Sequence, residues 1–336
     1  MSARARLALL SVVGAAVLSL GACSGPDPQP SPTLPQPDVS TTTAPPTPAG
    51  GTTASPTPAP TSSAQQSPTP TASPTKDSKP TKPTPKPTKK PSKPNKTTEP
   101  NASGGRWKPK AGLTWQWQLS GKLDTSVNAQ VYDVDLFDTS ASQVKQLHDK
   151  GRKVICYFSA GSYESGRPDS GDFPAAVKGE KMDGWPEYWL DIRDPRVLEI
   201  MAARMDLCAK KGFDGVEPDN VDAYDNDSGF GLTAADQMKY NKALAKLAHA
   251  RGLAIGLKND LEQVSTLQAS FDFAVNEECY EYDECSVLKA FINAGKPVFH
   301  VEYEVSTSTF CPTTTALGFS SMRKNLDLDA SRSPCP

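Results

Sequence analysis

Carboxylic acids recur at short intervals in the second half of the chain, and their spacing suits acid–base chemistry. Asp133 and Asp135 are two residues apart in one β-rich segment, and Glu217 and Asp219 are two residues apart in another. Because side chains alternate along a strand, each pair shares one face of its strand. Further acids follow three other β-rich segments, at Asp260, Glu277, Glu278 and Glu302. A single acid after a strand is usually a helix cap, but acids at so many strand ends indicate a shared site.

Glycoside hydrolysis is the chemistry that such a set of acids favours. One carboxylic acid protonates the leaving oxygen, and a carboxylate attacks the sugar or activates water. We therefore expect one acid to be ionised and its partner to be held protonated by burial or by like charge. Aromatic side chains offer flat apolar faces to sugar rings. The candidates are Trp115, Trp117, Tyr157, Tyr163, Trp185, Trp189, Tyr224, Tyr280 and Tyr303.

Two other classes of function stay open. A metal-dependent hydrolase would use carboxylate ligands for Ca²⁺ or Mg²⁺, and one loop contains Asp219, Asp222, Asp225 and Asp227. A non-catalytic carbohydrate-binding module of the cell envelope would keep the aromatic residues without the chemistry. A Ser-His-Asp triad is not supported, because no nucleophile elbow accompanies the three histidines, His148, His249 and His300.

Alternating strand and helix patterns supply the elements that position these acids. Strands are predicted at Leu113–Leu119, Val131–Phe137, Lys153–Ser159, Gly215–Asp219, Ala254–Lys258, Asp272–Asn276, Val298–Tyr303 and Gly318–Met322. Helices are predicted between them at Ser142–Lys150, Pro195–Lys211, Thr233–Arg251 and Cys285–Ala294. Eight βα units predict an α/β fold, the (β/α)8 TIM barrel, whose active site lies at the C-terminal strand ends where the acids are found.

An open doubly wound sheet is the alternative architecture. No G-x-G-x-x-G follows the first predicted strand, so a dinucleotide cofactor is not supported, and we expect no cofactor of any kind.

Longer sequence words resemble glycoside hydrolase family 114. They occur in order as Tyr132-Asp-Val-Asp-Leu-Phe-Asp, Lys153-Val-Ile-Cys-Tyr-Phe-Ser-Ala-Gly-Ser, Gly184-Trp-Pro, Trp189-Leu-Asp-Ile-Arg, Gly215-Val-Glu-Pro-Asp-Asn-Val-Asp, Gly256-Leu-Lys-Asn-Asp, Phe273-Ala-Val-Asn-Glu-Glu-Cys and Val301-Glu-Tyr. The resemblance implies a (β/α)8 barrel and endo-acting cleavage of α-1,4-linked galactosamine polymers. Ala223 stands where the family commonly has Gly, so the shape of that loop is open.

The resemblance also implies roles for individual residues. Asp219 is expected to be the nucleophile and Glu277 the general acid/base, with Glu217 and Glu278 as the nearest alternatives. The residues expected to line the sugar subsites are Asp133, Asp135, Tyr157, Lys258, Asn259, Asn276, Glu302 and Tyr303. Lys258 has an alternative role, which is to neutralise neighbouring acids in an ion-pair network.

The N-terminus resembles the export signal of a bacterial lipoprotein. Arg4 and Arg6 precede an apolar run from Leu7 to Leu20, which is too short for a membrane span of about 20 residues. The following Gly-Ala-Cys places Cys23 at the acylation position of a lipobox. We expect residues 1–22 to be removed and Cys23 to be lipidated, giving an extracytoplasmic, membrane-anchored protein. The alternative is ordinary cleavage after Ala22, which leaves Cys23 as a free thiol in a secreted protein.

Six further cysteines form an even set, which in an exported protein predicts disulfides. We favour pairs of cysteines that are neighbours along the chain, although six cysteines allow 15 connectivities. These pairs are Cys279 with Cys285, Cys311 with Cys335, and Cys156 with Cys208. The cysteines show no metal-ligand spacing, so a zinc site is not expected.

Residues 23–105 are predicted to be a disordered tether, and residues 106–336 a single catalytic domain. Between Pro26 and Pro100 lie 22 of the chain's 32 prolines, a composition that favours an extended polyproline II segment. Residues 1–105 carry a net charge of +6 and residues 106–336 a net charge of −8. An acidic domain disfavours nucleic acid and suits a neutral or cationic polysaccharide. We expect the domain to be a monomer.

Overall fold

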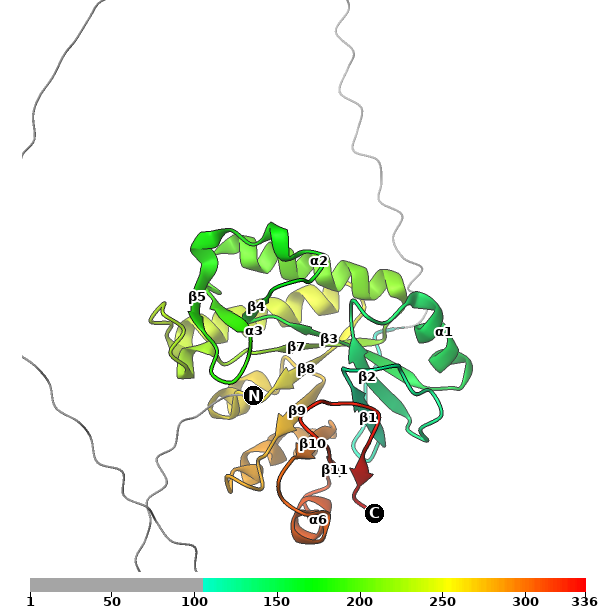
Figure 1. Ribbon diagram of the computed structural model, residues 1–336. Coiled ribbons are helices and arrows are strands. Elements are labelled where there is room, and N and C mark those ends of the chain that lie inside the picture. Colours follow the sequence, from blue (N-terminus) through cyan, green and yellow to red (C-terminus); the bar gives the residue numbers. More distant parts are fainter. Residues whose placement is uncertain (1–104) are drawn as a thin grey trace, which may run out of the picture. The chain divides into compact units, whose positions relative to one another are not determined.

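A curled parallel sheet forms the centre of the molecule. The structure, a computed structural model, describes residues 105–336 (Figure 1). Its main sheet has the strand order β1-β2-β3-β7-β8-β9-β10-β11-β12, in which all neighbours are parallel except the last pair. The strands are β1 (Trp115–Gln118), β2 (Val131–Asp135), β3 (Lys153–Ser159), β7 (Gly215–Asp219), β8 (Ala254–Lys258), β9 (Phe273–Glu277), β10 (Val298–Glu302), β11 (Ser320–Arg323) and β12 (Ser333–Pro334). Eight sequential parallel strands confirm the predicted (β/α)8 class.

Helices cover the outer side of this sheet, as Figure 1 shows for α2 and α3. They are α1 (Ala141–Asp149), α2 (Pro195–Lys211), α3 (Ala234–Ala250), α4 (Val264–Leu267), α5 (Lys289–Asn293) and α6 (Thr307–Ala316). Local sequence fixes their starts. Asp194 caps α2 in front of Pro195, and Thr233 forms a capping box with Asp236 at the start of α3. Gly212 ends α2 with a φ of 92°, which costs glycine little.

The C-terminal segment bridges the two edges of the curled sheet. No strand ladder joins β11 to β1 within residues 105–336. Instead, the backbone N–H of Leu119 donates to the carbonyl of Leu328 at 2.9 Å, and the Arg332 guanidinium donates to the carbonyl of Trp115. The Cys311–Cys335 disulfide ties the end of this segment to α6. The barrel is therefore closed by side chains and by the last residues of the chain.

Two apolar clusters fill the space on either side of the sheet. The larger lies between the sheet and the helices and includes Leu147, Val197, Met205 and Leu244. The smaller lies inside the barrel and consists of Trp115, Trp117, Val131, Ile155, Ala254, Phe273, Val275, Phe299, Val301, Tyr303 and Met322. The inner cluster forms a packed floor beneath the strand ends, as in other barrels of this class.

A small antiparallel sheet follows β3, and the sequence did not predict it. It has the order β4-β6-β5, with β4 (Ser162–Glu164), β5 (Lys178–Lys181) and β6 (Glu187–Leu190). Helices α4 and α6 were also not predicted. The three favoured disulfides are confirmed as Cys156–Cys208, Cys279–Cys285 and Cys311–Cys335. Among the described residues, no helix has the length and apolar character needed to cross a membrane. Cys23 and the predicted signal and tether lie outside the described residues.

Candidate active site

A buried lysine joins two carboxylates at the ends of neighbouring strands. Lys258 is the last residue of β8, and its Nζ lies 2.9 Å from Asp219 Oδ1 on β7 and 2.6 Å from Glu277 Oε2 on β9. Because both oxygens contact one nitrogen, they are at most 5.5 Å apart, the sum of these two distances. The structure thus brings together the two acids that the sequence analysis paired.

Neutral donors fix the orientation of both carboxylates. Asp219 accepts from the Tyr157 hydroxyl at 3.0 Å and from the backbone N–H of Asn220 at 2.7 Å. Glu277 accepts from the Tyr303 hydroxyl and, at 3.3 Å, from the Asn259 amide. Asn220 and Asn259 have φ angles of 59° and 47°, a left-handed conformation that is uncommon outside glycine. These strained turns lie next to the acids that they orient, as expected of a functional site.

Lys258 favours the ionised form of both acids of the pair. Burial alone raises the pKa of Asp219, but the charge of Lys258 more than offsets it and holds the pKa below its usual value. Burial likewise raises the pKa of Glu277, and Lys258 together with the Tyr303 hydrogen bond brings it well below the usual range. Our expectation that one of the two acids is protonated at rest is therefore wrong, because the sequence did not reveal that one cation contacts both.

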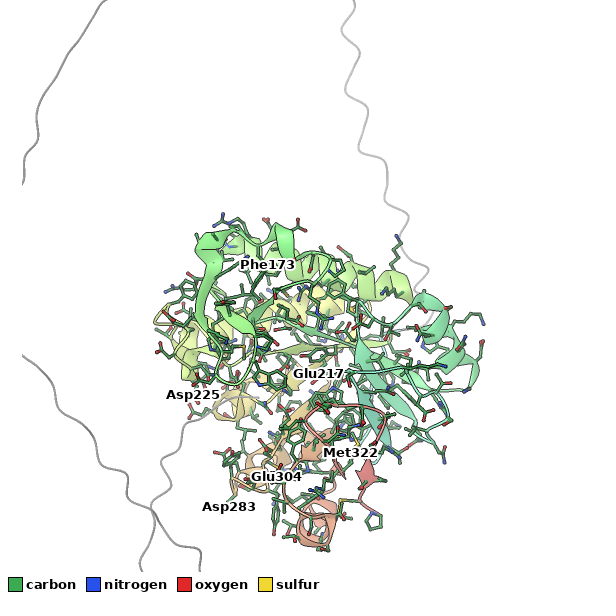
Figure 2. The ribbon with its side chains drawn as sticks, in the orientation of Figure 1. Phe173, Glu217, Asp225, Asp283, Glu304 and Met322 are labelled. Carbon is green, nitrogen blue, oxygen red and sulfur yellow. A yellow bond between two sulfur atoms is a disulfide. The ribbon has the colours of Figure 1, made fainter. Side chains whose placement is uncertain are left out.

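A second carboxyl pair lies beneath the first. Asp133 and Glu217 are completely buried, and none of their carboxyl oxygens receives a hydrogen bond from a donor other than the pair itself. Burial raises the pKa of Asp133 to about 7 and that of Glu217 well above its usual value. Figure 2 shows Glu217 near the middle of the molecule, in contrast to Asp225 and Asp283 at its edge. Glu217, an alternative catalytic acid in the sequence analysis, does not reach the cavity above it.

A cavity of about 550 Å³ opens above Asp219 and Glu277. Its lining includes the aromatic residues Trp117, Tyr157, Trp185 and Tyr303. One wall comes from the β4–β6 insertion, including Trp185 and Glu187, and another from the C-terminal residues Leu326–Leu328. Sequence reasoning had named Trp185 as a sugar platform but had not recognised these walls, whose only signal was the Gly184-Trp-Pro word.

A second cation balances two more acids of the cavity. Arg167 lies 2.9 Å from Asp135 and 2.6 Å from Glu164. Asp135, predicted from the sequence, lines the cavity in this ion-paired state. Arg167 and Glu164 were not predicted, because their positions depend on the fold of the insertion.

Several predicted subsite residues support the site from behind. Asn276 donates to the Asn259 side chain at 3.2 Å and does not line the cavity. Glu302 is completely buried and accepts from His300 at 2.7 Å and from the backbone N–H of Tyr280 at 2.8 Å. The predicted sugar contact of Glu302 is therefore wrong, since the residue holds the loop after β9 in place. Lys258 likewise serves the acids as an ion-pair partner, which was the alternative that the sequence left open.

Two other acids named from the sequence take no part in the central group. Glu278 follows Glu277 and has a φ of 61°. Burial raises the pKa of Glu278 to about 7, and the nearby charge of Glu277 contributes to this increase. Asp260 accepts from the Asn241 amide at 2.9 Å, and burial raises its pKa to about 8. Neither lines the cavity.

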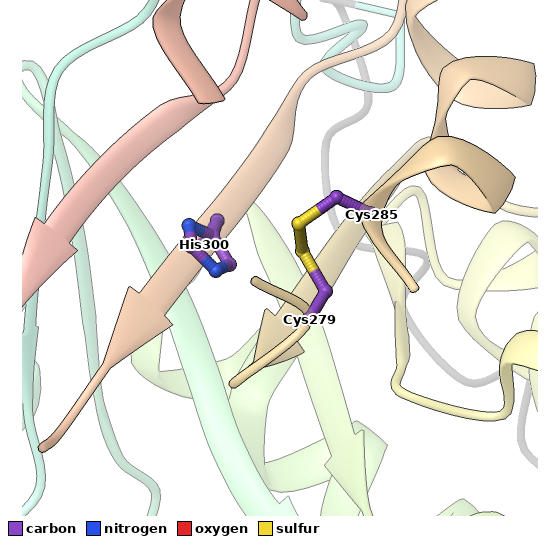
Figure 3. A group of neighbouring side chains, drawn as sticks. All are labelled: Cys279, Cys285 and His300. Atoms are coloured by element: carbon purple, nitrogen blue, oxygen red, sulfur yellow. A yellow bond between two sulfur atoms is a disulfide. The ribbon is translucent and has the colours of Figure 1, made fainter. Parts of the chain in front are cut away.

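The aspartates proposed for a metal-dependent hydrolase do not converge. Within the described part of the chain, the one group of three ligand atoms close enough to share a metal ion is Cys279, Cys285 and His300. Figure 3 shows that the two sulfur atoms are bonded to each other. This disulfide leaves no thiolate for a metal, and the nitrogens of His300 contact Ser321 and Glu302.

Known proteins share this architecture. The family model described as glycoside-hydrolase family GH114 matches residues 96–336. The crystal structure of Aspergillus fumigatus Ega3 in complex with galactosamine is 42% identical, covers 70% of this chain and all of its own (100%), and has a TM-score of 0.67. The glycoside hydrolase domain of PelA from Pseudomonas aeruginosa shares the fold at 13% identity and a TM-score of 0.54, over 65% of this chain and 97% of its own. An uncharacterized protein of Deinococcus radiodurans is 30% identical over 228 residues, 56% of this chain and 71% of its own.

Proposed function

Because the chain belongs to glycoside hydrolase family GH114, we propose that this glycosidase cleaves α-1,4 linkages within galactosamine-containing polysaccharides, using Asp219 and Glu277. The 42% identical Aspergillus structure was determined with galactosamine bound. The acidic balance of residues 106–336 suits a polymer whose free amines are positively charged.

The contact of Lys258 with both acids is the observation that carries the proposal. It limits the distance between their facing oxygens to 5.5 Å. Retaining glycosidases have carboxyl groups about 5 to 5.5 Å apart, whereas inverting enzymes need about 6.5 to 9.5 Å to admit a water molecule. This short approach of the two nearest oxygens favours retention of the anomeric configuration, through a covalent intermediate on one of the two acids, over the wider spacing of inverting enzymes.

Asp219 is suited to be the nucleophile, because Tyr157, Asn220 and Lys258 all stabilise its carboxylate. In the first step an oxygen of Asp219 bonds to the anomeric carbon, the glycosidic C–O bond breaks, and the proton of Glu277 goes to the leaving oxygen. In the second step Glu277 removes a proton from water, the water oxygen bonds to the anomeric carbon, and Asp219 is released. This second step leaves Glu277 protonated again, but because Lys258 favours its ionised form at rest, Glu277 must keep this proton or regain one from solvent when the next substrate binds.

This requirement gives the reaction a pH dependence. Because Lys258 holds the pKa of Glu277 below its usual value, the protonated fraction becomes smaller as the pH rises. We expect kcat/KM to increase as the pH falls from 7 towards 5, since the rate follows the fraction of Glu277 that carries the proton.

Release of oligosaccharides from a partly deacetylated α-1,4-galactosamine polymer tests the proposal. The purified full chain is compared with Asp219→Asn, with Glu277→Gln, and with Asp183→Asn as a control for an exposed acid outside the cavity. We expect the parent and the control to release products and both cavity variants to lose at least about a thousandfold in kcat, as for other nucleophile and acid/base residues. A variant of either acid that remains fully active would disprove its assigned role.

The biological location is a second part of the proposal. The lipobox ending at Cys23 and the proline-rich segment after it support a hydrolase that is tethered to the outer side of the cell membrane. From there the domain would act on polysaccharide of the cell envelope or its surroundings.

A further inference from the structure

Charge in the cavity is unevenly compensated, and Glu187 is the centre of the imbalance. Lys258 lies between Asp219 and Glu277, Arg167 contacts Asp135 and Glu164, and Arg204 lies 3.9 Å from Glu164, so these four acids all have a basic partner. Glu187 also lines the cavity. Within residues 105–336 it has no basic side chain within 4.0 Å.

The strand register places Glu187 where its negative charge destabilises the fold. Glu187 on β6 lies directly opposite Glu164 on β4, and like charges at facing positions of an antiparallel pair destabilise it. Arg167 binds Glu164 and leaves Glu187 without a counter-charge. Burial raises the pKa of Glu187 to about 7, and the charges of Glu164 and Asp219 add to the rise. A half-buried acid in such surroundings is expected to have a role outside the fold.

A chain of hydrogen bonds connects Glu187 with the nucleophile. The Ser162 hydroxyl donates to Glu187 Oε2 and lies 2.5 Å from the hydroxyl of Ser159. Ser159 accepts from the Asn220 amide at 2.9 Å, and the backbone N–H of Asn220 donates to Asp219 Oδ1. Only one oxygen of Glu187 is used in this chain, which leaves Oε1 for a ligand.

We propose that Glu187 binds the ammonium group of a deacetylated galactosamine unit next to the scissile bond, so that cleavage is selected by the free amine. This inference rests on the proposed function. A cation bound at Glu187 would also be attracted by the charges of Glu164 and Asp219, which act on this site. Trp185, two residues earlier, lines the same wall, and its indole is the kind of side chain that packs against a sugar ring. An N-acetylated unit is neutral and gains nothing from this charge.

Hydrolysis of two polymers that differ only in acetylation tests the inference. One is a fully deacetylated α-1,4-galactosamine polymer, and the other is the same polymer after chemical N-acetylation. The wild-type full chain is compared with Glu187→Gln, which keeps the size of the side chain, and with Asp183→Asn, an exposed acid in the same insertion. We expect Glu187→Gln to lose about 10- to 100-fold in kcat/KM on the deacetylated polymer, as for a hydrogen bond between charged groups, and to keep its rate on the acetylated one.

Binding experiments keep the inference testable if the hydrolysis is difficult to interpret. Calorimetry measures D-galactosamine and D-galactose binding to Glu277→Gln and to the double variant Glu277→Gln/Glu187→Gln, after thermal melting has shown that both are folded. We expect the preference for the amino sugar to disappear in the double variant. A preference that survives overturns the role of Glu187, as does an equal loss of hydrolysis on both polymers.

The outcomes separate this inference from the proposed function. Hydrolysis of the deacetylated polymer at the same rate by Glu187→Gln and wild type would overturn the inference and leave the function intact. If the wild type cleaves neither polymer, the proposed function is wrong, and the calorimetry still decides whether Glu187 recognises the amine.

Discussion

Replacing Lys258 by Met should make one acid of the Asp219–Glu277 pair retain a proton at neutral pH. The substitution keeps the length of the side chain and removes the charge that contacts Asp219 and Glu277. At a separation of at most 5.5 Å and an effective dielectric constant of about 20, two carboxylates repel by about 3 kcal/mol. This repulsion corresponds to about 2 pKa units, and burial raises the value further. One acid of the pair should therefore titrate above about pH 6.

Carbon-13 NMR of the Asp and Glu carboxyl carbons measures this change directly. In the wild type, both carboxyl signals should remain in their ionised positions down to about pH 4, because Lys258 lowers both pKa values. In Lys258→Met, one signal should move between about pH 6 and pH 8. Lys242→Met, which removes an exposed lysine of α3, should leave the titration of the pair unchanged.

A folded Lys258→Met protein that shows no new carboxyl titration above pH 6, relative to the wild type, would refute the predicted effect of the lysine charge. Such a result would mean that water or a rearranged side chain replaces the lysine charge. The same variant should move the alkaline limb of the pH–rate profile to higher pH, because the acid form of Glu277 would persist to higher pH.

Three further predictions concern other parts of the molecule. Glu187→Gln should increase the free energy of unfolding at pH 8 and leave it unchanged at pH 4, measured by denaturant titration. The pKa of Glu187 is raised from 4.5 to about 7. As the pH rises through this interval, the folded protein loses the stability associated with the neutral carboxyl group, by about 2 to 3 kcal/mol. A variant that is no more stable than the wild type at pH 8 would contradict the expected cost of burying the charged form of Glu187. Changing both Cys311 and Cys335 to Ser should lower the free energy of unfolding by about 3 kcal/mol, the loop-closure contribution expected for residues 24 positions apart. The double variant should also hydrolyse the polymer more slowly, because the released segment forms a wall of the cavity. An unchanged melting temperature would show that the segment is held without the disulfide. Cys23→Ser should abolish incorporation of labelled palmitate and move the protein from the membrane fraction to the medium, and continued labelling would disprove lipidation at Cys23.

The strands were predictable because local sequence determines them. β3, β7 and β8 have the predicted bounds, and Gly151, Gly212 and Gly252 precede them at the ends of the helical segments. The β4–β6 sheet was not predictable in this way. Its strands are three or four residues long, and β5 reads Lys-Gly-Glu-Lys, with no apolar pattern. Such short strands form because their pairing with β6 and the packing around them stabilise them, and neither is visible in their own residues.

The candidate site shows the same division between local and distant information. The sequence identified Asp219 and Glu217 as acids on one face of a strand, but did not establish which of them reaches the cavity. Two residues along a strand correspond to about 6.6 Å, so the structure places Asp219 at the mouth and Glu217 a layer below it. The effect of Lys258 on ionisation was equally hidden, because it depends on the side-by-side order of β7, β8 and β9.

That order also explains why the pair is anionic as a whole. A lysine on the middle strand contacts one acid from each neighbouring strand, so a single positive charge stabilises two negative ones. Arg167 repeats the arrangement with Asp135 and Glu164. Glu187 adds a further negative charge when it is ionised, and within residues 105–336 it has no basic side chain within 4.0 Å. A neutral polymer would gain little from this field, whereas a polymer with one ammonium group per sugar would supply the missing charges. The distribution of charge therefore supports our proposal that the enzyme recognises deacetylated galactosamine units.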